Sequence, residues 1–154
     1  MSPLEPLEIL QVIGYSIGAL LPLWMLFQLV THRSKLSSIE RLLALLALTM
    51  GGWHTSNLVV TLHGLFDLGF DTWTTLLRVA DTVAVVSITF AYSFLLHVHL
   101  HLWANAHGRS LNKGEHLRVY LSYVPTVFLL VAVPQLWTGD YAPMFTKLSF
   151  FVIP

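Results

Sequence analysis

The side chains that could do chemistry in this 154-residue chain are mainly histidines. His97 and His101 are four residues apart, so a helix would bring both imidazoles to one face. Two histidines at this spacing can share a metal ion. We therefore interpret His97 and His101 as candidate metal ligands, with His107 or His116 completing the site. The alternative is an interfacial helix end, where these histidines and Trp103 lie among lipid headgroups.

A second group contains an Arg–Asp pair, Arg78 and Asp81, and a histidine, His63. At a helical rise of ~1.5 Å per residue from the inner helix ends, His63 and Asp81 both stand roughly 33 Å up, near the outer membrane boundary. Ionisable groups within a bilayer are costly and tend to be paired. We expect His63, Arg78 and Asp81 to form a polar cluster that closes the outer end of a cavity between two helices. The alternative is an i,i+3 ion pair between Arg78 and Asp81 alone, at the wet interface.

His54 is the deepest ionisable residue, about 20 Å from the inner end of its helix. It follows Trp53, and the sequence offers it no charged partner. One interpretation is a hydrogen bond to a neighbouring helix or to a hydroxyl such as that of Thr89 or Tyr92. The other is axial ligation of a tetrapyrrole, haem or chlorophyll-like, because neutral imidazole is the usual ligand there.

The composition indicates that a membrane surrounds these residues. Hydrophobic residues make up 55% of the chain and charged residues 10%, and the mean hydropathy is +0.69. Soluble domains rarely have such values. The formal net charge is zero, which gives no reason to expect nucleic acid as a partner. The chain has no cysteine, so disulfides, thiolate metal sites and cysteine nucleophiles are excluded, and we find no motif of a known catalytic centre.

The apolar runs predict an all-α fold, a polytopic helical membrane bundle with four complete transmembrane helices and the start of a fifth. The expected spans are about 9–31, 39–62, 72–103 and 119–137, with the fifth beginning at about 147. Small residues at Gly14, Ser16 and Gly18 predict a close helix contact. Because the last run stops at Pro154, we expect the chain to be the N-terminal part of a longer protein.

The connections between the spans differ in charge. Those at 32–41 and 104–118 are basic, whereas the N-terminus and the connection after residue 62 are not. Because basic connections remain on the cytoplasmic side, the pattern predicts an N-terminus outside the cell. We expect a multi-pass protein of the bacterial inner membrane, in contact with lipid and with other transmembrane helices or subunits.

One stretch of the chain, residues 92–134, resembles the seven-transmembrane N-terminal sensing region of bacterial sensor histidine kinases. Three elements carry the resemblance: Leu95-Leu96-His97 at a helix end, the basic loop from Arg109 to Arg118, and Tyr123-Val124-Pro125 in the next helix. The resemblance implies a membrane-embedded input module of a two-component signal-transduction protein, whose kinase would lie beyond this chain. The alternative function is an accessory or pigment-binding subunit of a larger membrane complex, with His54 or a loop histidine as the ligand of the haem or chlorophyll.

Overall fold

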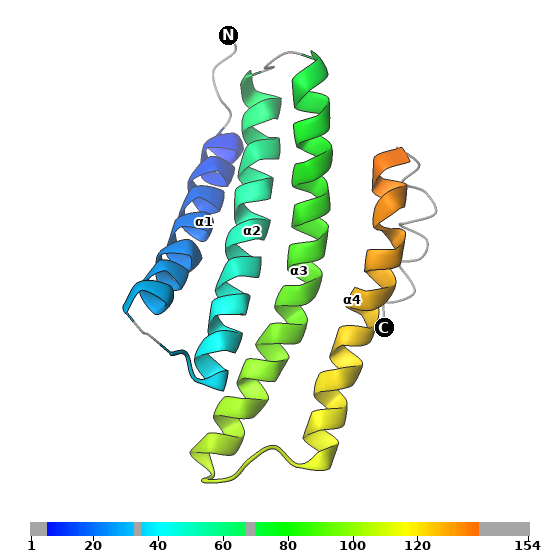
Figure 1. Cartoon of the computed structure of the whole chain (residues 1–154). Coiled ribbons are helices and arrows are strands. Elements are labelled where there is room, and N and C mark those ends of the chain that lie inside the picture. Colours follow the sequence, from blue (N-terminus) through cyan, green and yellow to red (C-terminus); the bar gives the residue numbers. More distant parts are fainter. Residues whose placement is uncertain (1–5, 33–34, 67–69, 139–154) are drawn as a thin grey trace.

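The computed structural model describes residues 6–32, 35–66 and 70–138, which form helices joined by short connections (Figure 1). The helices are α1 (Pro6–His32), α2 (Ser38–Phe66), α3 (Phe70–Ala106) and α4 (Lys113–Thr138). The predicted all-helical fold class is confirmed, and each helix extends past the predicted span at both ends. The predicted fifth helix lies outside the described residues.

Three of the described helical segments are long and apolar enough to cross a membrane. They are Pro6–His32, Ser38–Phe66 and Thr75–Ala106. Many large apolar side chains on these helices are exposed, as expected where lipid is the solvent, for example Leu20 at 68% and Trp24 at 61%. The chain therefore has the character of a helical membrane protein.

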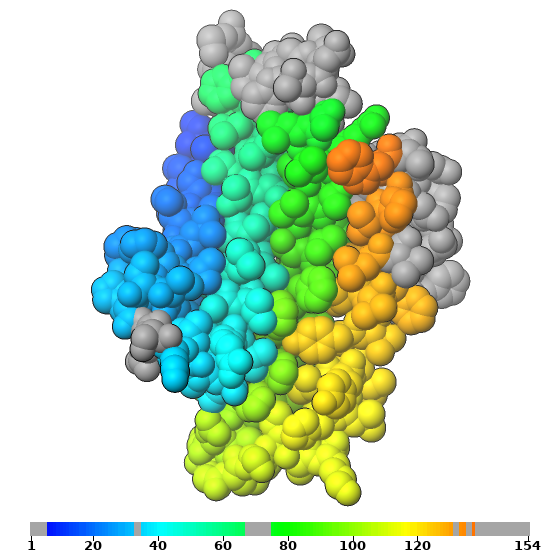
Figure 2. Space-filling view, in the orientation of Figure 1, coloured from blue at the N-terminus to red at the C-terminus, as the bar shows by residue number. Residues whose placement is uncertain are grey.

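The four helices are arranged in a single row. Within the described part of the chain, α1 contacts α2, α2 contacts α3 and α3 contacts α4, and no other pair of helices meets. Figure 2 shows this order from blue to orange across one broad face of the molecule. The described parts of the helices thus form a layer in which each helix contacts only its neighbours in sequence.

Two consecutive glycines bring α2 close to both of its neighbours. A Cβ atom on Gly51 would lie 2.8 Å from Cδ2 of Leu23 on α1, and one on Gly52 would lie 2.8 Å from the Ser87 hydroxyl on α3. Most of the buried apolar residues on α1, α2 and α3 are also small, such as Ala47, which is 1% exposed. Small residues at these contacts let the backbones approach closely, which is how transmembrane helices associate.

A capping box begins α2. The backbone N–H of Ser37 donates to the Glu40 carboxylate at 2.8 Å, and the N–H of Glu40 donates to the Ser37 hydroxyl at 3.3 Å. Two backbone donors that the first turn would otherwise leave unpaired are satisfied in this way. The helix therefore begins at Ser38, one residue before the predicted span.

Candidate functional site

Polar residues recur at every fourth position of α3, at Thr89, Ser93, His97 and His101. Because residues four apart share one face of a helix, they form a stripe, and the side-chain contacts of Ser93 and His97 show that it faces α4. We call this stripe and its partners on α4 the polar seam. The sequence analysis singled out the two histidines, named Thr89 only as a possible partner of His54, and missed Ser93. The i,i+4 repeat of polar residues within an apolar helix is the signal that could have found them.

Hydroxyl groups make the half of the polar seam that lies farther from the α3–α4 connection. Ser93 Oγ donates to the backbone carbonyl of Ser122 at 2.6 Å and lies 3.4 Å from Thr126 Oγ1. Thr126 Oγ1 also lies 3.4 Å from the carbonyl of Thr89, to which it can donate. Ser93 and Thr126 are each 1% exposed. A hydroxyl buried so completely would be costly without these partners, so the bonds fix how α4 sits against α3.

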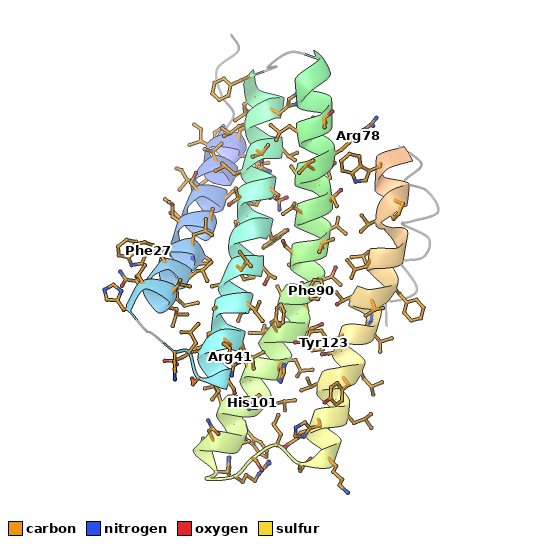
Figure 3. The ribbon with its side chains drawn as sticks, viewed as in Figure 1. Phe27, Arg41, Arg78, Phe90, His101 and Tyr123 are labelled. Atoms are coloured by element: carbon orange, nitrogen blue, oxygen red, sulfur yellow. The ribbon has the colours of Figure 1, made fainter. Side chains whose placement is uncertain are left out.

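Aromatic and imidazole rings make the other half, nearer the α3–α4 connection. His97 Nδ1 lies 3.3 Å from the Tyr123 hydroxyl, and the His97 and His101 ring centres are 5.0 Å apart. Phe94 packs edge-on against Tyr123, with ring centres 5.7 Å apart. Figure 3 shows His101 and Tyr123 in the lower half of the molecule, with Arg78 near the opposite end of α3. The two imidazoles place ring nitrogens in this half of the seam, and such nitrogens can bind a transition-metal ion.

The connection from α3 to α4 is a compact turn that begins at a helix C-cap. Gly108 has a φ of 65°, a left-handed conformation that favours glycine. The N–H of Gly108 donates to the carbonyl of Asn105 at 2.9 Å, and that of Arg109 to Ala104 at 3.1 Å. These two bonds are the pattern of a Schellman motif, which ends α3 at a defined residue.

An ion pair then joins this turn to the start of α4. Arg109 donates both ends of its guanidinium to the Glu115 carboxylate, at 2.8 and 2.7 Å. Glu115 also accepts from the N–H of Asn112 at 2.8 Å, while the Asn112 side chain accepts from the N–H of Glu115 at 2.9 Å. The guanidinium carbon lies 4.6 Å from the centre of the Trp103 ring, a cation–π contact back to α3. The sequence analysis assigned no role to Arg109 or Glu115.

The charge of the guanidinium changes the acidity of its partner. Hydrogen bonds from Arg109, and then from the Asn112 backbone, lower the pKa of Glu115 from 4.5 to about 2. The same hydrogen bond raises the pKa of Arg109. Both groups therefore stay charged at neutral pH, and the α3–α4 connection is held in one geometry.

His54 lies where α2 crosses α1. A Cβ atom on Gly18 would fall 2.5–2.6 Å from Nδ1, Cε1 and Cγ of His54, so the face of the imidazole rests against the bare backbone of α1. Tyr15 and Trp53 pack around it, with ring centres 6.2 and 4.5 Å away. Its Nδ1 is buried and has no hydrogen-bond partner among the described residues. Neither Thr89 nor Tyr92 makes the expected hydrogen bond to this nitrogen, and the Thr89 hydroxyl donates instead to the Val85 carbonyl of its own helix.

The cluster expected from His63, Arg78 and Asp81 remains a prediction. His63 belongs to α2, whereas Arg78 and Asp81 belong to α3. The Arg78 side chain is exposed and projects toward the side of the row where α4 lies (Figure 3). Among the described residues, no ion pair joins Arg78 to Asp81, so the alternative i,i+3 pair is not formed in this structure.

The polar seam is therefore the candidate site that the described residues build most completely. Among those residues, no three His, Cys, Asp or Glu side chains converge closely enough to hold a metal ion, so neither His107 nor His116 completes a site with His97 and His101. Comparison with known proteins finds no matching family, curated protein or solved structure.

Proposed function

We propose that this chain is a membrane-embedded input module that passes a change in helix packing to a partner on the cytoplasmic side. In this proposal α1, α2 and α3 are the fixed part and α4 is the part that responds. The partner is a cytoplasmic signalling domain such as a histidine kinase, which the resemblance of residues 92–134 suggests. All four helices cross the bacterial inner membrane, with the N-terminus outside and both basic connections inside.

The observation that carries the proposal is the different character of the helix contacts. Close glycine contacts join α2 to α1 and to α3. By contrast, α3 is the only described helix that α4 contacts, and the hydrogen bonds described between them come from hydroxyl groups and one His–Tyr pair. Interhelical hydrogen bonds of this kind contribute only about 0.6 kcal/mol each on average within membranes. A second arrangement of α4 is therefore accessible at a free-energy cost that a ligand or a partner can supply.

Spin labels on the chain can test whether α4 has two arrangements. The chain contains no cysteine, so pairs of introduced cysteines label cleanly. Leu48 on α2 and Val127 on α4 are 51% and 60% exposed, and labels there report the position of α4. Leu20 on α1, at 68%, paired with Leu48 is the matched control within the fixed part.

In lipid nanodiscs we expect two populated distances for the Leu48–Val127 pair and one for the Leu20–Leu48 pair. Substituting Ser93 with alanine removes a bond of the polar seam and should shift the balance between the two distances. A single narrow distance for Leu48–Val127, unchanged by Ser93→Ala, would contradict the proposal.

His54 supports a second candidate function, a subunit that binds a tetrapyrrole. An unpaired buried nitrogen costs about 1–3 kcal/mol, and such groups call for an explanation beyond packing. Ligation of a tetrapyrrole metal through the other ring nitrogen, Nε2, would leave the Nδ1 proton without an acceptor, so what favours this function is that no hydrogen bond competes for the imidazole, and not the pairing of Nδ1. The absorption spectrum of the purified protein decides: a Soret or chlorophyll band that is lost in His54→Ala supports this function, and a colourless protein contradicts it.

A further inference from the structure

We propose that His97 and His101 bind a divalent transition-metal ion at the end of α3 next to the basic connection. This inference does not depend on the proposed signalling function, because it rests on the geometry of two side chains and one neighbour. Both imidazoles are only partly exposed, and they lie where α3 approaches the start of α4.

The spacing of the two rings matches that of a shared ion. Two imidazoles that bind one metal through nitrogens at about 2.0–2.1 Å, at an angle near tetrahedral, have ring centres about 5 Å apart. The observed distance is 5.0 Å, with a tilt of 32° between the ring planes. The two rings are therefore already as far apart as two ligands of one ion, and the backbone of α3 need not change.

Tyr123 prepares His97 for this role. Its hydroxyl lies 3.3 Å from Nδ1 of His97. When Nδ1–H donates to the tyrosine oxygen, the lone pair is on Nε2, the nitrogen left for a metal. Metal-binding histidines almost always have such a second partner, which fixes the ring and its tautomer. Tyr123 is a positioning residue in this site.

The donor set determines the class of metal. Two imidazole nitrogens suit Zn²⁺, Ni²⁺ and Cu²⁺, whereas Mg²⁺ and Ca²⁺ require oxygen ligands. The described residues provide no third side chain of the ligating types within reach, so water completes the coordination. Such a site binds reversibly, and an ion in it also holds His97 in the orientation that contacts α4.

The test uses protein purified without a histidine tag and reconstituted in nanodiscs. Zn²⁺ binding is measured by calorimetry, and Cu²⁺ binding by electron paramagnetic resonance, which shows how many nitrogens bind the ion. We expect one ion with two nitrogen ligands. His97→Gln and His101→Gln should each weaken binding more than about tenfold, and Tyr123→Phe should weaken it by about tenfold.

His99 provides the matched control because it lies on the same helix between the two ligands, is exposed and points to another face. His99→Gln should leave binding unchanged. Circular dichroism and gel filtration identify any variant that fails to fold. If His97→Gln fails to fold, His101→Gln still gives a decisive result, because the His101 ring has no hydrogen bond to a described residue that the substitution would remove. Two results would overturn the proposal. One is that the wild-type chain binds the ion no more tightly than the His97→Gln, His101→Gln double variant. The other is that His99→Gln weakens ion binding as much as the substitutions of His97 and His101.

Discussion

At the scale of single residues, the histidines differ by what surrounds them and not by their place in the sequence. His97 meets a tyrosine and a second imidazole, whereas His54 meets a glycine backbone and two aromatic rings. The sequence identified both as candidates from type and spacing. It could not distinguish their environments, because the partners Tyr123 and Gly18 come from other helices.

Gly18→Ala should loosen the contact between α1 and α2. The added Cβ would lie 2.5 Å from His54 Nδ1, so one helix must shift, at a cost of about 1–3 kcal/mol of unfolding free energy. Unfolding in detergent followed by circular dichroism measures the change. Gly14→Ala is the matched control on the same helix, because nothing lies within 4 Å of its Cβ position. Combining Gly18→Ala with His54→Ala should recover part of the loss, and equal effects at Gly14 and Gly18 would contradict the assigned contact.

Glu115 makes the stability of the α3–α4 connection depend on pH. Its pKa is about 2 in the folded chain, against 4.5 as the ordinary value, so the folded state favours the charged form. The stabilisation is therefore complete above about pH 4.5 and is lost as the pH falls toward 2. Carbon-13 NMR of labelled glutamate carboxyls can follow the titration directly. Arg109→Gln should move the Glu115 titration up toward its ordinary value, and an unchanged midpoint would show that the guanidinium is not its main partner.

At the scale of elements, the polar seam attaches α4 to α3 through bonds that single substitutions can remove. Ser93→Ala deletes the donor to the Ser122 carbonyl and should lower the unfolding free energy by about 0.6–1.7 kcal/mol. Thr82→Val on the same helix is the control, because that hydroxyl is exposed and donates to the Arg78 carbonyl within α3. Its effect should stay below about 0.5 kcal/mol. If the two variants behave alike, the seam does not hold α4 in place.

The element boundaries show what sequence reasoning can and cannot reach. The start of α2 was predictable because its capping box is local, with Ser37 and Glu40 three residues apart. The start of α4 at Lys113 has the same local signal, because Asn112 and Glu115 bond reciprocally three residues apart, although the predicted span began only at 119. The pairing of Glu115 with Arg109 is what the sequence does not show, because it depends on the turn at Gly108. Apolar runs locate the part of a helix that lies in lipid. The polar turns that extend the helix depend on capping hydrogen bonds and ion pairs.

At the scale of the whole molecule, the described helices form a layer. Hydropathy predicted the helices but not that each would contact only its sequence neighbours, because lipid-facing and partner-facing apolar surfaces have the same composition. The expected cluster of His63, Arg78 and Asp81 rests on equal depth and on the shared face of Arg78 and Asp81, and the sequence does not show how α2 and α3 are rotated toward each other.

The proposed role of α4 as the responding helix depends on how many times the chain crosses the membrane and in which direction. Single cysteines introduced at Ser38, Asp71, Ser110 and Thr138 place one label at each of four helix ends in this naturally cysteine-free chain. A membrane-impermeant maleimide applied to intact spheroplasts should label Asp71→Cys and Thr138→Cys, and should label Ser38→Cys and Ser110→Cys only after permeabilisation. Labelling of Ser110→Cys from outside would reverse the orientation. Protection of Thr138→Cys until permeabilisation would show that α4 does not cross the membrane, which contradicts the proposed role of α4 as the responding helix.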